Sequence, residues 1–149
     1  MVAASRGHTV IVSELNAIIR GFHTRALGPG IFHTKSLTPS EMKIARHQTI
    51  VDGGGRITSI DEESGLTDHN HEAFARARYS EASIAQASAV FAWGAEDSET
   101  LKRIYPAFSS KIHETGSPRV DLWKSQFSRI FDLPPIAPSK PFLLAVSYQ

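Results

Sequence analysis

Three consecutive carboxylates, Asp61, Glu62 and Glu63, lie at the end of a run of alternating apolar and polar residues, 56–61, whose last member is Asp61. Such alternation is typical of a half-buried strand, so the carboxylates should lie where this strand ends. In parallel α/β sheets the functional residues gather at the carboxyl ends of the strands, and carboxylates there serve as general acids or bases. We therefore predict Glu62 and Glu63 as catalytic residues and Asp61 as a substrate-binding residue. The alternative is a solvated acidic loop.

A second candidate site is the turn that begins at Gly116. The strand-like run 111–114 breaks there, Ser117 is a plausible helix N-cap, and Pro118 suits the first helical position. A helix N-terminus together with the guanidinium of Arg119 attracts anions. We predict that Gly116, Ser117 and Arg119 bind an anionic part of the substrate, although Arg119 could equally fix the turn as a structural clip.

Other patterns that could carry chemistry are weaker. The segment 68–72 contains metal-ligand residue types, but it precedes a helix, where residues two apart point in different directions, so we expect a polar loop or helix cap and no metal site. The glycines at 53–55 follow a helix and open a strand, which favours a helix C-cap over a phosphate-binding loop. The chain has no cysteine, and it lacks a nucleophile elbow and a Walker loop, so thiolate, hydrolase and P-loop chemistry are disfavoured.

Composition indicates a soluble protein of ordinary domain size. The 149 residues are 41% hydrophobic, which is enough to bury a core. Sixteen basic residues oppose fifteen acidic ones, and this balance argues against binding driven by nucleic-acid phosphates. No apolar run approaches the ~20 residues of a membrane span, and the first residues make a poor signal peptide. We expect a cytoplasmic location.

The elements needed to position these sites alternate along the chain. Residues 1–6 resemble the last turn of a helix closed by Gly7, and a helix with Thr38 as its N-cap should precede the glycine triplet. Further helices are expected at 72–88, at 95–105, and from Pro118 onward with Val120, Trp123 and Phe127 buried. Strands are expected at 8–13, 31–34, 56–61, 89–93 and 111–114. This alternation predicts an α/β fold, a Rossmann-like parallel sheet with helices on both faces, that lacks its first strand.

The last part of the chain differs in composition. Four prolines within residues 134–141 predict an extended linker over 133–141, and 142–149 reads as a strand without its own domain. We therefore expect residues 1–132 to form one domain and 142–149 to begin a second. The chain would then be incomplete at both ends.

Several of these stretches together resemble one family. "TGSPRVDLW" (residues 115–123) resembles the TGxPRxDLL signature of surface carbohydrate biosynthesis proteins, which have the GT-B glycosyltransferase architecture. "SIDEESGL", "FAWGAEDSETLKRIYP" and "FLLAVSY" resemble further segments of that family in the same order, and "RGHTVIV" fits its second Rossmann strand. Ser64 interrupts the acidic run, and Ser117 replaces the usual asparagine. A related turn occurs in CDP-glycerol glycerophosphotransferases.

The resemblance implies the amino-terminal, acceptor-side half of a GT-B fold. It implies a glycosyltransferase of surface polysaccharide biosynthesis that transfers a sugar from a nucleotide-sugar donor to a glycan or lipid-linked acceptor. The donor would bind mainly to a carboxy-terminal domain, so this chain alone should be inactive. No cofactor and no nucleic acid are expected, and the acceptor could bring the protein to a membrane surface. Alternatives are a nucleotide-sugar epimerase, a CDP-glycerol glycerophosphotransferase-like enzyme, or a non-catalytic acceptor-binding module.

Overall fold

The computed structural model describes residues 2–64, 70–122 and 124–127. Its contacts divide the chain into two units, residues 1–117 and residues 118–149. The first unit contains the sheet, and the described residues of the second unit contain a short α-helix at Pro118–Asp121 and a 3₁₀ turn at 125–127. The predicted linker at 133–141 and the predicted strand at 142–149 lie outside the described residues.

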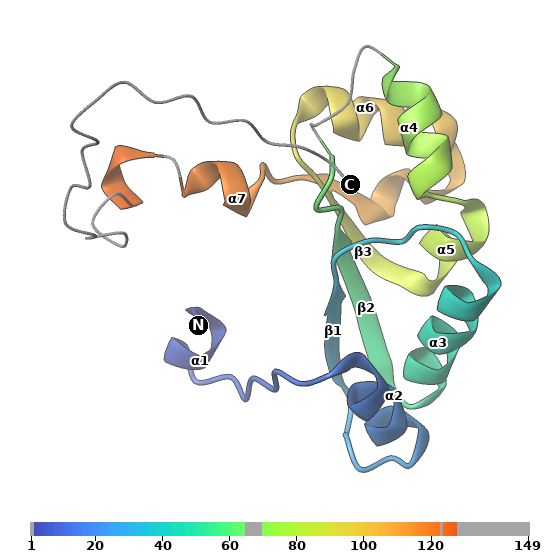
Figure 1. The fold of residues 1–149 in the computed structure, drawn as a ribbon. Helices are drawn as coiled ribbons and strands as arrows, with labels where there is room; N and C mark the ends of the chain where they lie inside the picture. The colour runs from blue at the N-terminus through green and yellow to red at the C-terminus, as the bar shows by residue number, and fades with distance from the viewer. Residues whose placement is uncertain (1, 65–69, 123, 128–149) are drawn as a thin grey trace, which may run out of the picture. The chain divides into compact units, whose positions relative to one another are not determined.

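The first unit is built on a parallel sheet, as predicted, and this sheet has four strands (Figure 1). The strands stand in the sheet in the same order as in the chain: β1 (Gly30–Thr34), β2 (Gly55–Ile60), β3 (Ala87–Ala92) and β4 (Ile112–Glu114). All three pairings are parallel, so the carboxyl ends of the strands meet at one edge. Helices flank the sheet, and the fold is Rossmann-like.

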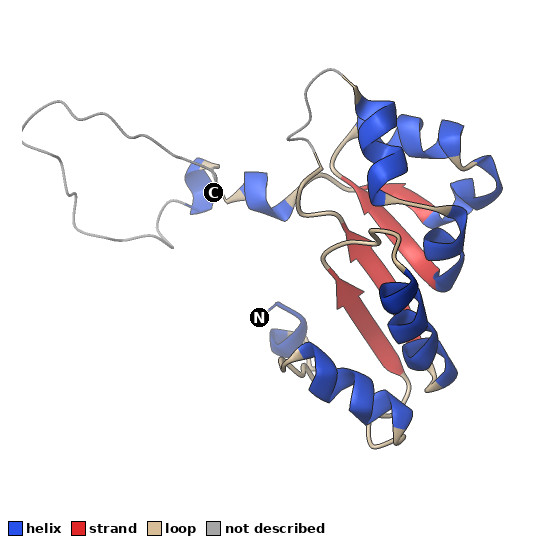
Figure 2. Cartoon of the chain, turned by 45° about the vertical axis from the view of Figure 1, so that its right-hand side comes forward, coloured by secondary structure: helices blue, strands red, loops and turns tan. Residues whose placement is uncertain are grey.

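Helices connect each strand of the sheet to the next, while α1 and α2 precede β1 and α7 follows β4 (Figure 2). Helix α3 contacts β2, α5 contacts β3, and α6 contacts both β3 and β4, while α2 packs against α3 and α4 against α6. Their bounds are α1 Val2–Ser5, α2 Leu15–His23, α3 Glu41–Asp52, α4 His71–Arg78, α5 Glu81–Gln86, α6 Ala95–Ile104, the 3₁₀ helix η1 Pro106–Lys111, and α7 Pro118–Asp121. The described residues include no helix that is both long enough and apolar enough to cross a membrane.

The core follows from the alternation within the strands. In β2 the side chain of Ile57 is fully buried while Arg56 points to solvent, because successive strand residues face opposite sides of the sheet. Burial of each such aliphatic side chain contributes about 1.5–3 kcal/mol. The core joins apolar residues of three strands to those of the helices: Ile57, Val90, Ile112, Ile50, Ile84, Leu101 and Tyr105.

Two predicted glycine caps are confirmed. Helix α1 ends at Gly7, which has φ +84°, and His8 N–H donates to the carbonyl of Ala3, as in a Schellman motif. Helix α3 ends at Gly53, and Gly54 adopts φ +89°. The glycine triplet is therefore a helix end that leads into β2.

The predicted strand at 8–13 is wrong. These residues form no strand, and Val10, Ile11 and Val12 are 44%, 57% and 89% exposed. A β-branched run becomes a strand only where neighbouring backbone groups pair with it. The four strands of the described sheet leave this run unpaired.

Three helix boundaries also differ from the prediction. The N-cap of α3 is Ser40 rather than Thr38, because the Ser40 hydroxyl accepts a bond from Lys43 N–H and helps start the helix there. The predicted helix at 72–88 is two helices, since a capping box at Ser80 starts a new one after the extended residue Tyr79.

The helix that begins at Pro118 is also shorter than predicted. It ends at Asp121, and Val120 is 40% exposed rather than buried. Four residues form barely one turn, and a turn without a packed apolar face gains little from tertiary contacts. Trp123 lies outside the described residues.

We predict that Gly55→Ala destabilises the protein by about 1–3 kcal/mol, because a methyl group there overpacks the core. A Cβ at this position would lie 2.5 Å from Ile50 Cγ2 and 2.9 Å from Phe22 Cε1. Gly28→Ala is the matched control, since its Cβ would meet no atom within 4 Å. Urea unfolding measures both, and equal stability of the two variants would contradict the packing argument.

Candidate functional site

The loops that follow β1, β2 and β3 meet at the carboxyl edge of the sheet. Glu62 N–H donates to the Lys35 carbonyl over 3.1 Å, which joins the first two loops. The indole Nε1 of Trp93 donates to the Asp61 carbonyl over 2.7 Å, which joins the second and the third. The predicted gathering of polar residues at this edge is therefore present, and it is centred on the acidic run.

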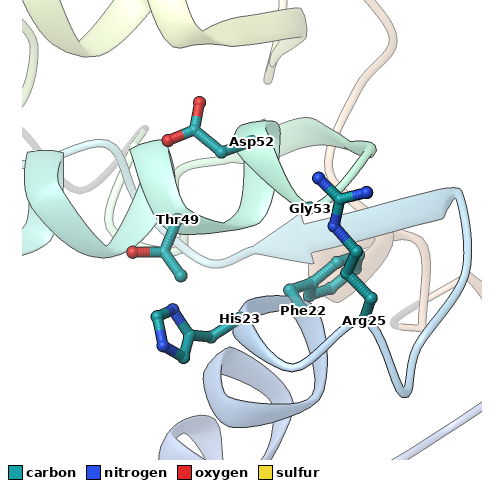
Figure 3. A pocket seen from close by; sticks show the side chains of 6 residues that line it. All are labelled: Phe22, His23, Arg25, Thr49, Asp52 and Gly53. Carbon is teal, nitrogen blue, oxygen red and sulfur yellow. The ribbon is translucent and has the colours of Figure 1, made fainter.

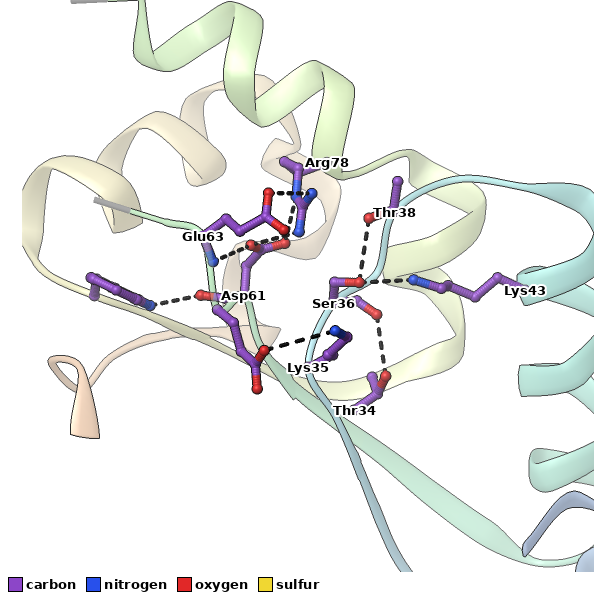
Figure 4. A network of polar contacts seen from close by, with 10 residues as sticks. Thr34, Lys35, Ser36, Thr38, Lys43, Asp61, Glu63 and Arg78 are labelled. Carbon is purple, nitrogen blue, oxygen red and sulfur yellow. Dashed lines mark hydrogen bonds and ion pairs between the residues drawn. The ribbon is translucent and has the colours of Figure 1, made fainter. Parts of the chain in front are cut away.

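A buried ion pair stands at the centre of the site (Figure 4). The side chain of Asp61 is 0% exposed, and Arg78 binds it through Nε at 2.9 Å and Nη2 at 3.0 Å. The Nη1 of Arg78 also donates to Glu63 Oε2 over 2.9 Å. These bonds raise the pKa of Arg78 above its ordinary value, with the hydrogen bonds to Asp61 as the largest cause. Arg78 therefore ties the catalytic candidate Glu63 to a fixed, buried carboxylate.

Arg78 is held where α4 ends. The chain turns extended at Tyr79, whose side chain is 2% exposed and whose carbonyl accepts a bond from the Tyr105 hydroxyl at 2.7 Å. The guanidinium also lies 5.8 Å from the centre of the Phe74 ring, a cation–π distance. Three hydrogen bonds to the loop after β2 and one ring contact within α4 thus fix the direction of this arginine.

Glu62 is placed differently from Glu63. Its side chain is 48% exposed, and its carboxylate lies 3.9 Å from Lys35 Nζ, a surface pair of little energetic weight. Glu63 is also exposed, at 62%, but the bond to Arg78 orients it. The site therefore offers one accessible carboxylate with a loose partner and one that is held in place.

A second basic residue lies beside this cluster. Lys43 Nζ donates to Ser36 Oγ over 2.8 Å, and Ser36 is itself buried in the loop after β1. Burial lowers the pKa of Lys43, the nearby charge of Arg78 lowers it further, and Asp61 opposes the change. The sequence prediction missed both Lys43 and Arg78. They lie 18 residues before and 17 residues after Asp61, and no local spacing marks them.

The turn at Gly116 has the predicted geometry. Gly116 adopts φ +82°, its N–H donates to the Ala92 carbonyl over 3.2 Å, and Ser117 is 6% exposed. This half of the turn belongs to the first unit and lies beyond the end of β3. Arg119 is exposed and belongs to the second unit, so its proposed part in binding an anion stays a prediction.

A third carboxylate, Asp97, lies at the carboxyl end of β3. Its Oδ2 accepts a bond from Trp93 N–H at 3.0 Å, and Ser64 Oγ lies close to the same carboxylate. Burial raises the pKa of Asp97 and the charge of Asp61 adds to the rise, while the bond from Trp93 N–H, the nearby Ser64 hydroxyl and the charge of His71 oppose it. Burial likewise raises the pKa of the Tyr79 hydroxyl. The sequence alone marks Asp97 only as an acidic residue in the first turn of a helix.

Two other features of the first unit do not extend the site. Asn70 caps α4 by accepting a bond from Ala73 N–H, and the described residues contain no group of three side chains that could hold a metal ion.

A pocket of about 170 Å³ lies where α2 and α3 end, and Arg25 beside it has φ +58° (Figure 3). It borders Gly53, just before β2 begins, so it lies at the amino edge of the sheet. Its lining residues are Phe22, His23, Arg25, Thr49, Asp52 and Gly53.

Comparison of the chain with protein-family models, with curated proteins and with solved structures gives no match.

We predict that Asp97→Asn stabilises the protein in a pH-dependent way. The folded-state pKa of Asp97 is raised, so the folded protein binds more protons than the unfolded chain above the ordinary aspartate pKa of 3.8. Wild-type stability should then fall as the pH rises through that folded-state pKa, whereas the asparagine variant escapes this loss and still accepts the Trp93 bond.

Urea unfolding between pH 3.5 and pH 7 tests this expectation. The stability difference between the variant and the wild type should be smallest at pH 3.5 and should grow in favour of asparagine as the pH rises. Glu99→Gln removes the same charge from an exposed position of α6 and serves as control. A difference that is constant over this range would contradict the account.

Proposed function

We propose that this chain is the acceptor-side part of a GT-B-type glycosyltransferase that acts in the cytoplasm on a surface polysaccharide. The enzyme would transfer a sugar from a nucleotide-sugar donor to a glycan or lipid-linked acceptor. The observation that carries the proposal is the carboxylate cluster at the carboxyl edge of a parallel sheet. Its second support is the resemblance of "SIDEESGL" and "TGSPRVDLW" to surface carbohydrate biosynthesis proteins.

In this proposal Glu62 is the general base. It is the more loosely held of the two exposed carboxylates, and a base must reach the acceptor hydroxyl within about 2.6–3.2 Å. Glu62 takes the hydroxyl proton, the hydroxyl oxygen bonds to the anomeric carbon of the donor sugar, and the nucleoside diphosphate leaves with the electrons of the broken bond. Glu63, oriented by Arg78, holds the acceptor by hydrogen bonds.

The anionic leaving group needs cations and backbone donors. Arg119 and the turn at Gly116 and Ser117 are the proposed ligands for a phosphate group, with most of the donor held by a carboxy-terminal domain. No cofactor takes part in this scheme. An acceptor carried on a lipid would bring the enzyme to the membrane surface as a peripheral protein.

Glu62→Gln should lower the turnover of the full-length protein by about 10²–10⁴-fold, because the variant cannot take a proton. Glu63→Gln should chiefly raise KM for the acceptor, since an amide still accepts hydrogen bonds but loses the Arg78 ion pair. The measurement is transfer of sugar from a panel of nucleotide-sugar donors to lipid-linked glycans, followed by mass spectrometry.

Arg119→Ala in the same assay should weaken donor binding with a smaller effect on turnover. Glu99→Gln is the matched control for loss of a carboxylate outside the cluster. If folded Glu62→Gln and Glu63→Gln proteins both keep normal turnover, the acidic run is a solvated loop and the catalytic carboxylate lies elsewhere.

A further inference from the structure

A cavity of about 300 Å³ lies between α4 and the first turn of α6, beside the acidic cluster. No part of the proposed transfer reaction uses it. Its walls come from one face of α4, from the loop after β3, and from the start of α6: His71, Phe74, Trp93, Gly94, Ala95, Glu96 and Asp97. A volume of this size accommodates a small organic group and is too small for a whole nucleotide sugar.

Two aromatic rings form the apolar part of the cavity. Both polar hydrogens of Trp93 are already used, because its backbone N–H donates to Asp97 and its indole Nε1 donates to the Asp61 carbonyl. These bonds fix the indole ring and leave its surface available for packing against a ligand. Phe74 already has the Arg78 guanidinium 5.8 Å from its ring centre, which shows that a cation is accepted beside this ring.

The charged groups of the cavity are mostly acidic. Glu96 and Asp97 line it, and the described lining includes no lysine or arginine. His71, the basic residue of the described lining, has its Nε2 3.3 Å from Glu96 Oε1 and so pairs with Glu96, while its charge acts on Asp97 through space. Arg78, the nearest guanidinium to the rings, is bound by Asp61 and Glu63.

No described residue forms an ion pair with Asp97, although the charge of a protonated His71 acts on it through space. The hydrogen-bond donor to Asp97 is the neutral N–H of Trp93, and the neutral hydroxyl of Ser64 lies nearby. A half-buried carboxylate gains most from a cation placed beside it, because solvent screens such a pair only weakly. The cavity therefore combines two aromatic rings with a carboxylate that a cation would stabilise.

We propose that the cavity between α4 and α6 binds an organic ammonium group, with Trp93 and Phe74 packed against its carbon atoms and Asp97 as its counter-ion. Aromatic rings attract ammonium groups through their negative faces, and an aromatic site with an acidic residue is a common way to hold methylated ammonium ions. Phosphate-bearing ligands are disfavoured by the two carboxylates. The proposal stands independently of the transferase proposal. If both hold, the ammonium group would belong to the acceptor.

Fluorescence of Trp93 tests the proposal directly. The chain has two tryptophans, so Trp123→Phe leaves Trp93 as the only indole and serves as the parent protein. The probe is choline chloride, titrated against sodium chloride at equal ionic strength. We expect a saturable change in Trp93 emission, and no saturable change with 3,3-dimethylbutanol, the uncharged carbon analogue of choline.

Single substitutions measure the contribution of the counter-ion to choline affinity separately from that of the rings. Asp97→Asn should weaken choline binding by about tenfold or more, and Phe74→Leu by several-fold, in line with the strength of desolvated cation–π contacts. Glu99→Gln, which removes a carboxylate of α6 outside the cavity, should leave the affinity within about twofold. Urea unfolding of each variant shows that it is folded before titration. Because Phe74→Leu keeps every carboxylate, it tests the site even if Asp97→Asn perturbs α6.

The same assay distinguishes the source of the ammonium group and the rival ligands. Saturation by choline indicates a quaternary head group, and saturation by glucosamine indicates an amino sugar, and either supports the proposal. Equal binding of choline and its uncharged analogue, saturation by glucose alone, or undiminished binding by Asp97→Asn would overturn it. No sugar transfer is measured, so failure here is separate from failure of the transferase proposal.

Discussion

The bidentate pair between Asp61 and Arg78 is the interaction on which the arrangement of the site depends. A carboxylate with no exposed surface is costly unless it is paired and hydrogen-bonded, and Arg78 supplies both bonds at 2.9 Å and 3.0 Å. The same guanidinium then fixes Glu63, and the Asp61 carbonyl fixes the Trp93 indole. Asp61 thus connects the end of β2 to α4 through its buried carboxylate and to the loop after β3 through its backbone carbonyl, and it positions both the acidic run and the cavity beside α6.

The parallel sheet makes this arrangement possible. Because all strands point the same way, residues distant in the chain are brought to one edge, and the pair spans 17 residues between β2 and the end of α4. At the opposite edge, two glycines allow close packing. Gly53 lies against Phe22, and Gly55 lies against Ile50 of α3 and Phe22, so that neither position has room for a Cβ atom.

Local patterns in the sequence predicted most of the sheet and the position of the acidic run. Alternation predicted β2, and the glycine triplet predicted the end of α3. Acidic residues in the first turn of α6 and basic residues in its last turn predicted where this helix begins and ends. The strand predicted at 8–13 was wrong, because β-branched residues only favour the extended conformation, while strand pairing depends on neighbours that the local sequence does not contain. The break after Tyr79 was missed because helix propensity is high on both sides, and the Ser80 capping box outweighs it.

Within the site, the sequence located Glu62 and Glu63 but gave no sign of their different surroundings. Arg78, Lys43 and Asp97 reach the cluster only through tertiary structure, so no spacing rule finds them. Asp61 was expected to contact substrate, whereas its side chain is fully buried and bound by Arg78. Asp61 therefore holds Arg78 in place, and Arg78 in turn orients Glu63.

A double-mutant cycle on Asp61→Asn and Arg78→Met, read by urea unfolding at pH 7, tests this account most directly. Arg78→Met leaves the buried Asp61 carboxylate without its ion-pair partner and should cost about 3–5 kcal/mol, whereas Asp61→Asn leaves Arg78 paired with Glu63 and should cost less. The double variant should cost less than the sum by more than about 1 kcal/mol, whereas the exposed pair Glu72 and Arg76 should couple by about 0.5 kcal/mol or less. Additive effects of Asp61→Asn and Arg78→Met would show that the two side chains do not support each other, and the central claim would be wrong.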